Sequence, residues 1–242
     1  MYKKISIIIP VYNEDKYISK VLQRVIKANT LGLVKEIIII NDGSTDNTTE
    51  VIRRFIKANN NKKAKIVNIK LKKNSGKCTA LKNGFLKSTG DIVVIQDADL
   101  EYSPNDYPSL IEPFLNNGAD VVYGSRFISS QPHRVLYFWH YVINVFLTTF
   151  SNILTDINFT DIETGYKVFK GDLIRRLASK LQSRRFGFEP EITARIAKIP
   201  NLKIFEIGIS YSGRTYQEGK KIGWKDGLLT IFEIIKYNLF TK

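Results

Sequence analysis

Residues 36–46 read EIIIINDGSTD, a run of four isoleucines that passes directly into a loop of small, polar and acidic residues. The run is short, apolar and β-branched, which is typical of a strand buried on both faces of a sheet. The same pattern opens the chain in KISIIIPVYNE, residues 4–14, and returns in IVVIQDADLE, residues 92–101. In a parallel sheet, ligands bind beyond the carboxyl ends of the strands, so a site is expected in these three loops.

Segments with apolar residues at helical spacing alternate with the predicted strands. These strands lie at Ile5–Ile9, Ile37–Ile40, Ile66–Leu71, Ile92–Ile95, Ala119–Tyr123, Tyr166–Phe169 and Ile204–Ile209. The predicted helices lie at Tyr17–Ile26, Val51–Ile56, Thr79–Leu86, Tyr107–Asn116, Val135–Thr155, Pro190–Ala197 and Trp224–Phe240. This alternation predicts an α/β fold, in which a mainly parallel sheet is flanked by helices on both faces.

The composition indicates a folded protein with anionic partners. Lys and Arg total 37 against 23 acidic residues, which gives a net charge of +14 and points to nucleotide phosphates, nucleic acid or an acidic membrane surface. Cys78 is the single cysteine, so no intrachain disulfide can form. The apolar run Ile5–Ile9 is too short for the core of a signal peptide, and a cytoplasmic location is expected.

Asp97 and Asp99 follow the predicted strand Ile92–Ile95 at a spacing of two residues. Two unpaired carboxylates at the end of one strand would repel each other. A hard divalent cation removes this repulsion, because Mg²⁺ and Mn²⁺ prefer oxygen ligands that they share with substrate phosphates. The spacing alone is weak evidence, but three polar loops in order, each behind its own strand, are much stronger.

Eight short motifs together resemble a known family. PVYNE (residues 10–14), NDGSTD (41–46), NSGK (74–77) and DAD (97–99) resemble the family 2 glycosyltransferases with the GT-A fold, which is Rossmann-like. GSR (124–126), ETGYK (163–167), FGFE (186–189) and YSGRT (211–215) are similar to the dolichyl-phosphate mannose synthase branch of that family. The motifs extend over nearly the whole chain. The Gln-x-x-Arg-Trp signature of processive polysaccharide synthases is absent, so a polymerase is not expected.

The resemblance implies one GT-A domain over residues 1–242, with a nucleotide-sugar-binding half (1–124) and an acceptor and membrane-interface half (125–242). It implies a donor site that contains Pro10, Tyr12, Glu14, Asp42, Lys77, Asp97 and Lys220. Mg²⁺ or Mn²⁺ is expected at Asp97, Asp99 and Glu101. Cys78 stands where the family usually has a small residue, and the expectation is that it crowds the donor pocket.

The expected reaction is the inverting, metal-dependent transfer of a hexose from GDP-mannose or UDP-glucose to a polyprenyl or dolichyl phosphate. The metal at Asp99 would stabilise the leaving nucleotide diphosphate. A phosphate monoester is already largely ionised, so this acceptor needs cations and no dedicated base. Arg126 and Arg214 are the candidates, with Arg134, Lys220 and Lys221 as further cations. Glu163 is a candidate general base and equally a candidate structural partner of Lys167.

Val135–Thr155 contains 21 residues without a charge. Its polar residues His140, Asn144, Thr148 and Ser151 fall close to one stripe, so it is predicted to be an amphipathic helix that lies in a membrane interface. The open alternative is a helix buried on its own domain or on a partner in a homodimer. Trp224–Phe240 repeats the pattern, and peripheral attachment to the cytoplasmic face of an anionic membrane is expected.

Three other functions compete with this prediction. The acceptor could be a hydroxyl of a glycan, a lipid-linked sugar or a protein. The chain could bind nucleotide sugars without turnover, although it retains the pair Asp97 and Asp99. A nucleic-acid partner would explain the charge, but the basic residues lack aromatic interleaving on a recognised motif, so none is expected.

Overall fold

The computed structural model describes residues 2–59, 64–128, 134–135, 137–183, 187–214 and 224–241. A seven-stranded sheet has the order β3-β2-β1-β4-β6-β5-β7. Its strands are β1 (Lys4–Val11), β2 (Val34–Asn41), β3 (Ala64–Lys70), β4 (Ile92–Ile95), β5 (Val121–Ser125), β6 (Lys167–Lys170) and β7 (Ile204–Gly208). The helices are α1 (Ile18–Lys27), α2 (Thr48–Ala58), α3 (Lys77–Lys87), the short 3₁₀ helix η1 (Pro104–Asp106), α4 (Tyr107–Asn116), α5 (Phe138–Thr155), α6 (Gly171–Ala178), α7 (Phe188–Ala197) and α8 (Trp224–Leu239).

The mainly parallel α/β fold is confirmed, and each predicted strand and helix corresponds to one observed element. Two features differ from the sequence-based expectation. β6 runs antiparallel to both β4 and β5, its neighbours in the sheet. Helix α6 was not predicted. It is only eight residues long and follows β6 without a loop. Its buried residues Leu173, Ile174 and Leu177 span little more than one helical turn, which is too short for a helical repeat to be recognised in the sequence.

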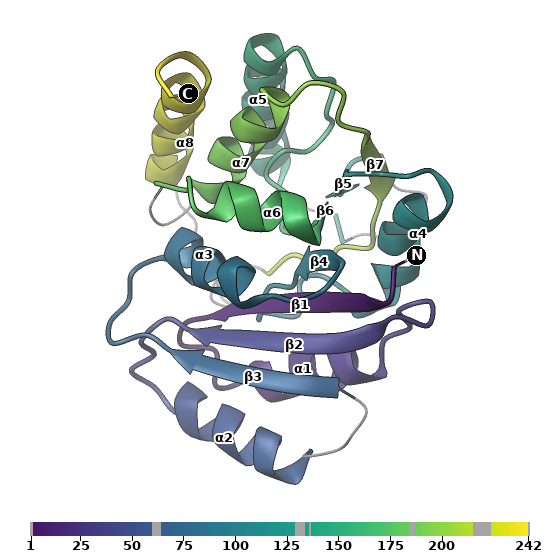
Figure 1. Ribbon diagram of the computed structural model, residues 1–242. Coiled ribbons are helices and arrows are strands. Elements are labelled where there is room, and N and C mark those ends of the chain that lie inside the picture. Colours follow the sequence, from purple (N-terminus) through teal and green to yellow (C-terminus); the bar gives the residue numbers. More distant parts are fainter. Residues whose placement is uncertain are drawn as a thin grey trace.

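The strands bury alternate residues in two cores on opposite faces of the sheet. Ile7 and Ile9 of β1 pack into the first core with residues of α1, α2 and α4. Ile8 packs into the second core with residues of α3, α6 and α7. In Figure 1, α1 lies behind β2 and β3 and α2 lies below them, while α5, α7 and α8 stand together at the top. The continuous apolar runs of the sequence are therefore strands covered on both faces.

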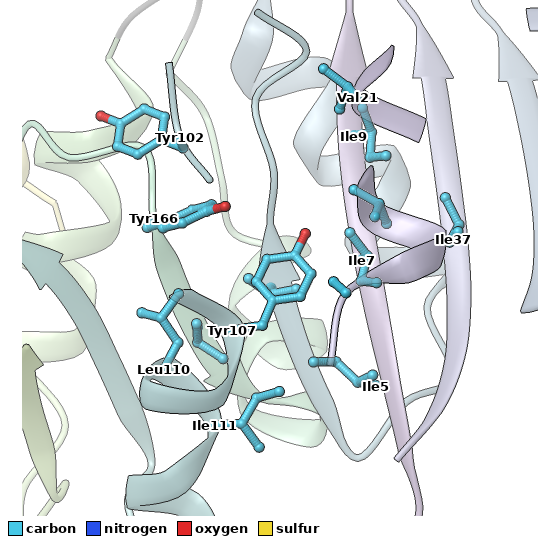
Figure 2. Close-up of a cluster of buried hydrophobic side chains, with 14 of the residues drawn as sticks. Ile5, Ile7, Ile9, Val21, Ile37, Tyr102, Tyr107, Leu110, Ile111 and Tyr166 are labelled. Atoms are coloured by element: carbon cyan, nitrogen blue, oxygen red, sulfur yellow. The ribbon is translucent and has the colours of Figure 1, made fainter. Parts of the chain in front are cut away.

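A column of tyrosines fixes the loop that follows β4 (Figure 2). Tyr107 and Tyr166 are buried, and both hydroxyls donate to Oε1 of Gln96 over 2.8 Å. The ring of Tyr102 packs on Tyr166 with centroids 4.9 Å apart, and its hydroxyl accepts from the amide of Gly165. These contacts position the segment after β4 against the segment before β6.

Glu36 lies buried in β2, where four groups donate to its carboxylate. Ser6 Oγ lies 2.6 Å away, Lys4 Nζ 3.2 Å, and the amide and hydroxyl of Thr89 lie at 2.9 and 3.0 Å. Burial by itself would raise the pKa of Glu36, but these hydrogen bonds outweigh it and hold the pKa at about 2. Because the pKa is lower in the folded state, Glu36 stabilises the fold above its ordinary pKa. That contribution is lost as the pH falls from about 4.5 towards 2.

We predict that Glu36→Gln lowers the unfolding free energy at pH 7 by up to about 3 kcal/mol and flattens its decline in acid. Urea unfolding at pH 7, 4.5 and 3 measures both effects. The exposed Glu112→Gln is the control and should keep the wild-type profile. An acid decline as steep in Glu36→Gln as in the wild type would contradict the assignment.

Candidate active site

A cleft of about 1530 Å³ lies at the carboxyl edge of the sheet. Apart from Arg134, it is lined by every candidate site residue that the structure describes, namely Pro10, Tyr12, Glu14, Asp42, Lys77, Asp97, Asp99, Glu101, Arg126, Glu163 and Arg214. Lys220 and Lys221 lie outside the described residues. Residues from nearly the whole chain meet here because β1, β2, β4, β5 and β7 all end at this edge.

The antiparallel direction of β6 adds a loop that precedes a strand. Lys167, the first residue of β6, pairs with Tyr123 near the end of β5. Residues 163–165 therefore reach the same edge as the loops that follow the parallel strands. Gly165 approaches so closely that a Cβ atom there would lie 2.3 Å from Oδ2 of Asp97. Only glycine allows this contact, which explains the Gly of the ETG motif.

Lys77, at the start of α3, bridges two carboxylates. Its Nζ lies 3.1 Å from Oδ1 of Asp97 and 2.9 Å from Oε1 of Glu189. The three side chains are largely withdrawn from solvent, and both carboxylates raise the pKa of Lys77 against the effect of its burial. Lys77 is thus a fixed positive charge between the loop after β4 and helix α7.

Arg214 stands among a second set of carboxylates. Its Nη2 lies 3.0 Å from Asp99, its Nε 3.4 Å from Glu101, and its Nη1 3.6 Å from Glu14. Between Asp99 and Glu101, the backbone of Leu100 is in the left-handed region (φ 66°), and the chain turns at this residue. Burial, and then the charges of Asp97 and Glu101, raise the pKa of Asp99 to about 7. This concentration of negative charge requires a cation nearby, and here the guanidinium of Arg214 supplies it.

Asp97 and Asp99 also have cationic partners within the protein, which the sequence-based argument for a divalent cation did not include: Lys77 pairs with the first and Arg214 with the second. Within the described ranges, no group of three His, Cys, Asp or Glu side chains is arranged to hold a metal ion. The oxygen donors nevertheless suit Mg²⁺ or Mn²⁺, and Arg214 is a stand-in cation among three of them.

Asp42 organises the loop before α3. Its carboxylate accepts from the amide of Ser75 over 2.9 Å and from the amide of Gly76 over 2.7 Å. The next residue, Gly43, has a φ of +67°, and a Cβ atom there would lie 2.5 Å from the backbone of Lys73. Glycine is therefore required at this position for the two loops to pack together. Asp42 lines the cleft, and the loops after β2 and β3 form one wall.

Arg126, which follows β5, is held in a nearly buried pair with Asp161. Its Nε and Nη2 donate to the two carboxylate oxygens over 2.7 Å each, and Nη2 also donates to Asn144 of α5. The carboxylate of Glu206 accepts hydrogen bonds from the amides of Thr160 and Asp161 and so holds the loop that carries Asp161. Such a bidentate pair fixes the guanidinium plane at the cleft wall.

The structure differs from two expectations. Cys78 does not crowd the donor pocket, because its side chain is buried in the second core and its Sγ contacts Ser183 Oγ over 3.0 Å. Arg134 is exposed and is not among the residues that line the cleft. Its Nη1 donates to the carbonyl of Gly213.

Helices α5 and α8 form the apolar end of the cleft, where Trp139, Ile143, Leu147 and Leu229 line it. On the predicted polar stripe of α5, Thr148 and Ser151 are buried against the protein, and Asn144 binds Arg126. The opposite face is open, since 71% of Trp139 and 56% of Phe146 is exposed. The polar stripe therefore faces the protein, and the aromatic face is directed outward.

Sequence reasoning assigned no role to Glu189, Asp161, Tyr102 or Tyr211, which support or line the cleft. Glu189 was part of a quoted motif, so a signal existed. Asp161 carried none, because its partner Arg126 is 35 residues away in the sequence.

A mainly parallel sheet with a cleft at its carboxyl edge, lined by an Asp-x-Asp pair and cations, defines a Rossmann-like protein built for an anionic ligand. The model of the family described as glycosyl transferase family 2 matches residues 6–178, and the chain belongs to this family.

Solved structures of glucosyl-3-phosphoglycerate synthase from Mycobacterium tuberculosis have a similar fold. The complex with Mn²⁺, uridine diphosphate and phosphoglyceric acid has a TM-score of 0.69 at 19% identity, covering 98% of this chain and 79% of that one. The complex with uridine diphosphate alone has a TM-score of 0.70 at 18% identity, covering 97% and 80%. The complex with Mg²⁺ and uridine diphosphate has a TM-score of 0.67 at 18% identity, covering 98% and 79%.

We predict that Asp161→Asn lowers the unfolding free energy by about 3–5 kcal/mol, because it leaves Arg126 as a buried charge without its counter-ion. The double variant Arg126→Gln/Asp161→Asn should cost less than the single change, since both charges are then absent. Urea unfolding of the two variants measures the difference. A loss below about 1 kcal/mol for Asp161→Asn would show that the pair does not hold the loop.

Proposed function

We propose that the protein transfers a hexose from a nucleotide-diphosphate sugar, UDP-glucose or GDP-mannose, to a polyprenyl or dolichyl phosphate, with inversion at the anomeric carbon. The observation that carries this proposal is the composition of the cleft. The cleft brings together carboxylates with Lys77, Arg126 beside Asn144 of α5, and apolar side chains of α5 and α8. A nucleotide diphosphate, a phosphate and a hydrocarbon chain need these three environments.

The donor half of the site would lie within residues 1–124. Pro10, Tyr12, Glu14 and Asp42 line the cleft beside Lys77 and Asp97. Mg²⁺ or Mn²⁺ would be held by Asp99 and Glu101 with Asp97, and when bound it would stabilise negative charge on the leaving diphosphate. Mn²⁺ and Mg²⁺ accompany uridine diphosphate in the similar synthase structures, which supports this choice of ion. Lys77 would contribute a further fixed positive charge beside the leaving group.

The acceptor half would lie within residues 125–242. Arg126 is directed by Asp161 and Asn144 and, among the described residues, uses only its Nε and Nη2 in hydrogen bonds. Its remaining donors suit a phosphate oxygen. A phosphate monoester attacks as an anion, so the chain need not supply a base. Arg214 would join Arg126 once a divalent cation takes its place at the carboxylates.

The lipid side is the exposed apolar surface of α5 and α8. On α8, 60% of Phe232 and 59% of Leu228 is exposed, beside the open face of Trp139 and Phe146 on α5. Aromatic and aliphatic groups of this kind bind the boundary between headgroups and acyl chains. No helix in the described part of the chain has both the length and the hydropathy needed to cross a bilayer. We therefore propose peripheral attachment through α5 and α8 on the cytoplasmic face, next to the mouth of the cleft.

The deciding experiment offers UDP-glucose and GDP-mannose, each with Mn²⁺ or Mg²⁺, to polyprenyl phosphate and to phosphoglyceric acid. We expect labelled sugar in the lipid extract. Asp99→Asn should lower this transfer more than about hundredfold, because the metal contributes several kcal/mol at about 1.4 kcal/mol per tenfold change in rate. Transfer to phosphoglyceric acid alone would favour a hydroxyl acceptor. Activity of Asp99→Asn within about threefold of the wild type would refute the metal site.

Replacing Trp139 and Phe146 with Ser should weaken binding to vesicles and slow transfer to a long-chain lipid phosphate. Transfer to a short, water-soluble phosphate should change much less. Flotation with and without anionic lipid, across salt concentrations, measures binding, because each Lys or Arg near the surface adds about 1 kcal/mol that salt weakens. Val34→Ser, an exposed residue at the opposite edge of the sheet, is the control. Equal losses with both acceptors would show that α5 supports the fold and does not bind the membrane.

A further inference from the structure

Glu163 lines the cleft from the loop before β6, but the mechanism above gives it no task. It is not an ion-pair partner of Lys167, although the two are close in sequence. Nζ of Lys167 donates to the carbonyls of Ile162 over 2.8 Å and Thr164 over 2.5 Å, and it lies 4.6 Å from the centre of the Tyr123 ring. Within the described residues, no ion pair joins Lys167 to Glu163. Lys167 therefore acts on Glu163 only through its charge and not through a direct contact.

Three buried side-chain oxygens have no hydrogen-bond partner among the described residues, namely Ser151 Oγ, Glu163 Oε1 and Glu233 Oε2. Of these three residues, only Glu163 lines the cleft. A buried acceptor without a partner costs about 1–3 kcal/mol, so such atoms are rare in folded proteins. A site that receives a ligand can carry this cost, because the ligand supplies the missing donor.

The position of Glu163 indicates which part of a ligand it meets. Its carboxyl lies within the electrostatic influence of Glu189, which pairs with Lys77, and of Arg126 with its partner Asp161. Glu163 thus lies near both the Lys77–Glu189 pair, on the proposed leaving-group side, and the Arg126–Asp161 pair, on the proposed acceptor side. In a displacement reaction the transferred group lies between the leaving group and the nucleophile.

Burial, followed by the charge of Glu189, raises the pKa of Glu163 to about 7, against the opposing effect of Lys167 and Arg126. A carboxyl group in this condition is partly protonated at neutral pH. It can accept a hydrogen bond from a hydroxyl group and can also donate one. Hexoses present hydroxyl groups that do both.

We propose that Glu163 binds a hydroxyl group of the transferred hexose and that this contact determines which hexose the enzyme accepts. The assignment rests on the proposed function, because it requires a sugar between the two phosphates. A site built to hydrogen-bond a hydroxyl rejects an analogue without it, since the protein group is then left unpaired. Glu163 is accordingly a specificity residue and not the general base.

The test is a cycle of variants and substrates. Wild type, Glu163→Ala and Glu163→Gln are assayed for kcat/KM with the donor that the acceptor assay identifies, UDP-glucose or GDP-mannose, and with its 2-, 3-, 4- and 6-deoxy analogues. Wild type should reject one analogue at least about tenfold more than the others. Glu163→Ala should lose at least about tenfold with the parent donor and change little with that one analogue.

Glu163→Gln separates a sugar contact from a base, because an amide can donate and accept but cannot take a proton. It should retain activity within about tenfold of the wild type, whereas loss of a general base costs roughly 10²–10⁴-fold. Calorimetry with the nucleotide diphosphate should give wild-type affinity for both variants, which shows that the rest of the cleft is intact. The exposed Glu112→Gln is the control for expression and stability.

Two results would overturn the assignment. If Glu163→Ala lowers kcat/KM by the same factor with the parent donor and every deoxy analogue, no single hydroxyl meets Glu163. If Glu163→Gln is as impaired as Glu163→Ala with all donors, Glu163 acts on a proton. In both cases the transferase function stands. A wild-type protein that turns over no donor would refute the proposed function and this assignment together.

Discussion

The structure depends on pairing the buried carboxylates at the carboxyl edge of the sheet with cations. Asp97 and Glu189 share Lys77, Asp99 and Glu101 share Arg214, and Asp161 holds Arg126. Each of these carboxylates would be strongly destabilising on its own in this environment. The cations come from loops and helices far apart in the sequence. Pairing therefore connects the two halves of the chain as well as balancing the charge of the cleft.

The same pairing makes the site responsive to ligands. Under the proposed function, Arg214 would leave its carboxylates when a divalent cation took over their charge, and it could then bind a phosphate. Arg126 is different, because Asp161 and Asn144 fix its plane, while its Nη1 makes no hydrogen bond to the described residues. The position of Arg214 would thus depend on whether a divalent cation is bound, whereas Arg126 keeps a constant orientation. Two anions that must approach each other need positive charges of both kinds.

The two amphipathic helices, α5 and α8, differ from the rest of the protein in their exposed apolar faces. In α5 the polar residues Thr148 and Ser151 are buried against the protein, where the hydroxyl of Thr148 accepts from the amide of Ile162, and the aromatic side chains of Trp139 and Phe146 are exposed. An exposed apolar surface of this size is unusual for a protein that works in water and marks a surface for interaction. Residues of the same two helices line the cleft, and under the proposed function a lipid could therefore enter from the membrane without exposing its chain to water.

The sequence determined the sheet, its covering helices and the loops that would form the site. Buried strands read as apolar runs, and their carboxyl ends meet at one edge by geometry, so Asp42, Asp97 and Asp99 could be placed in one cleft before any contact was known. It also showed that Val135–Thr155 is amphipathic, because that pattern is local.

Only the tertiary structure decided which charges pair, which way β6 runs and which face of α5 is open. The partners of Asp97, Asp99 and Arg126 are between 20 and 115 residues distant, and spacing in a sequence carries no information about such contacts. The direction of β6 brought Glu163 and Gly165 into the site from a loop that precedes a strand. The unpartnered oxygen of Glu163 has no sequence signal at all, because an empty hydrogen-bonding position is a property of the surrounding atoms.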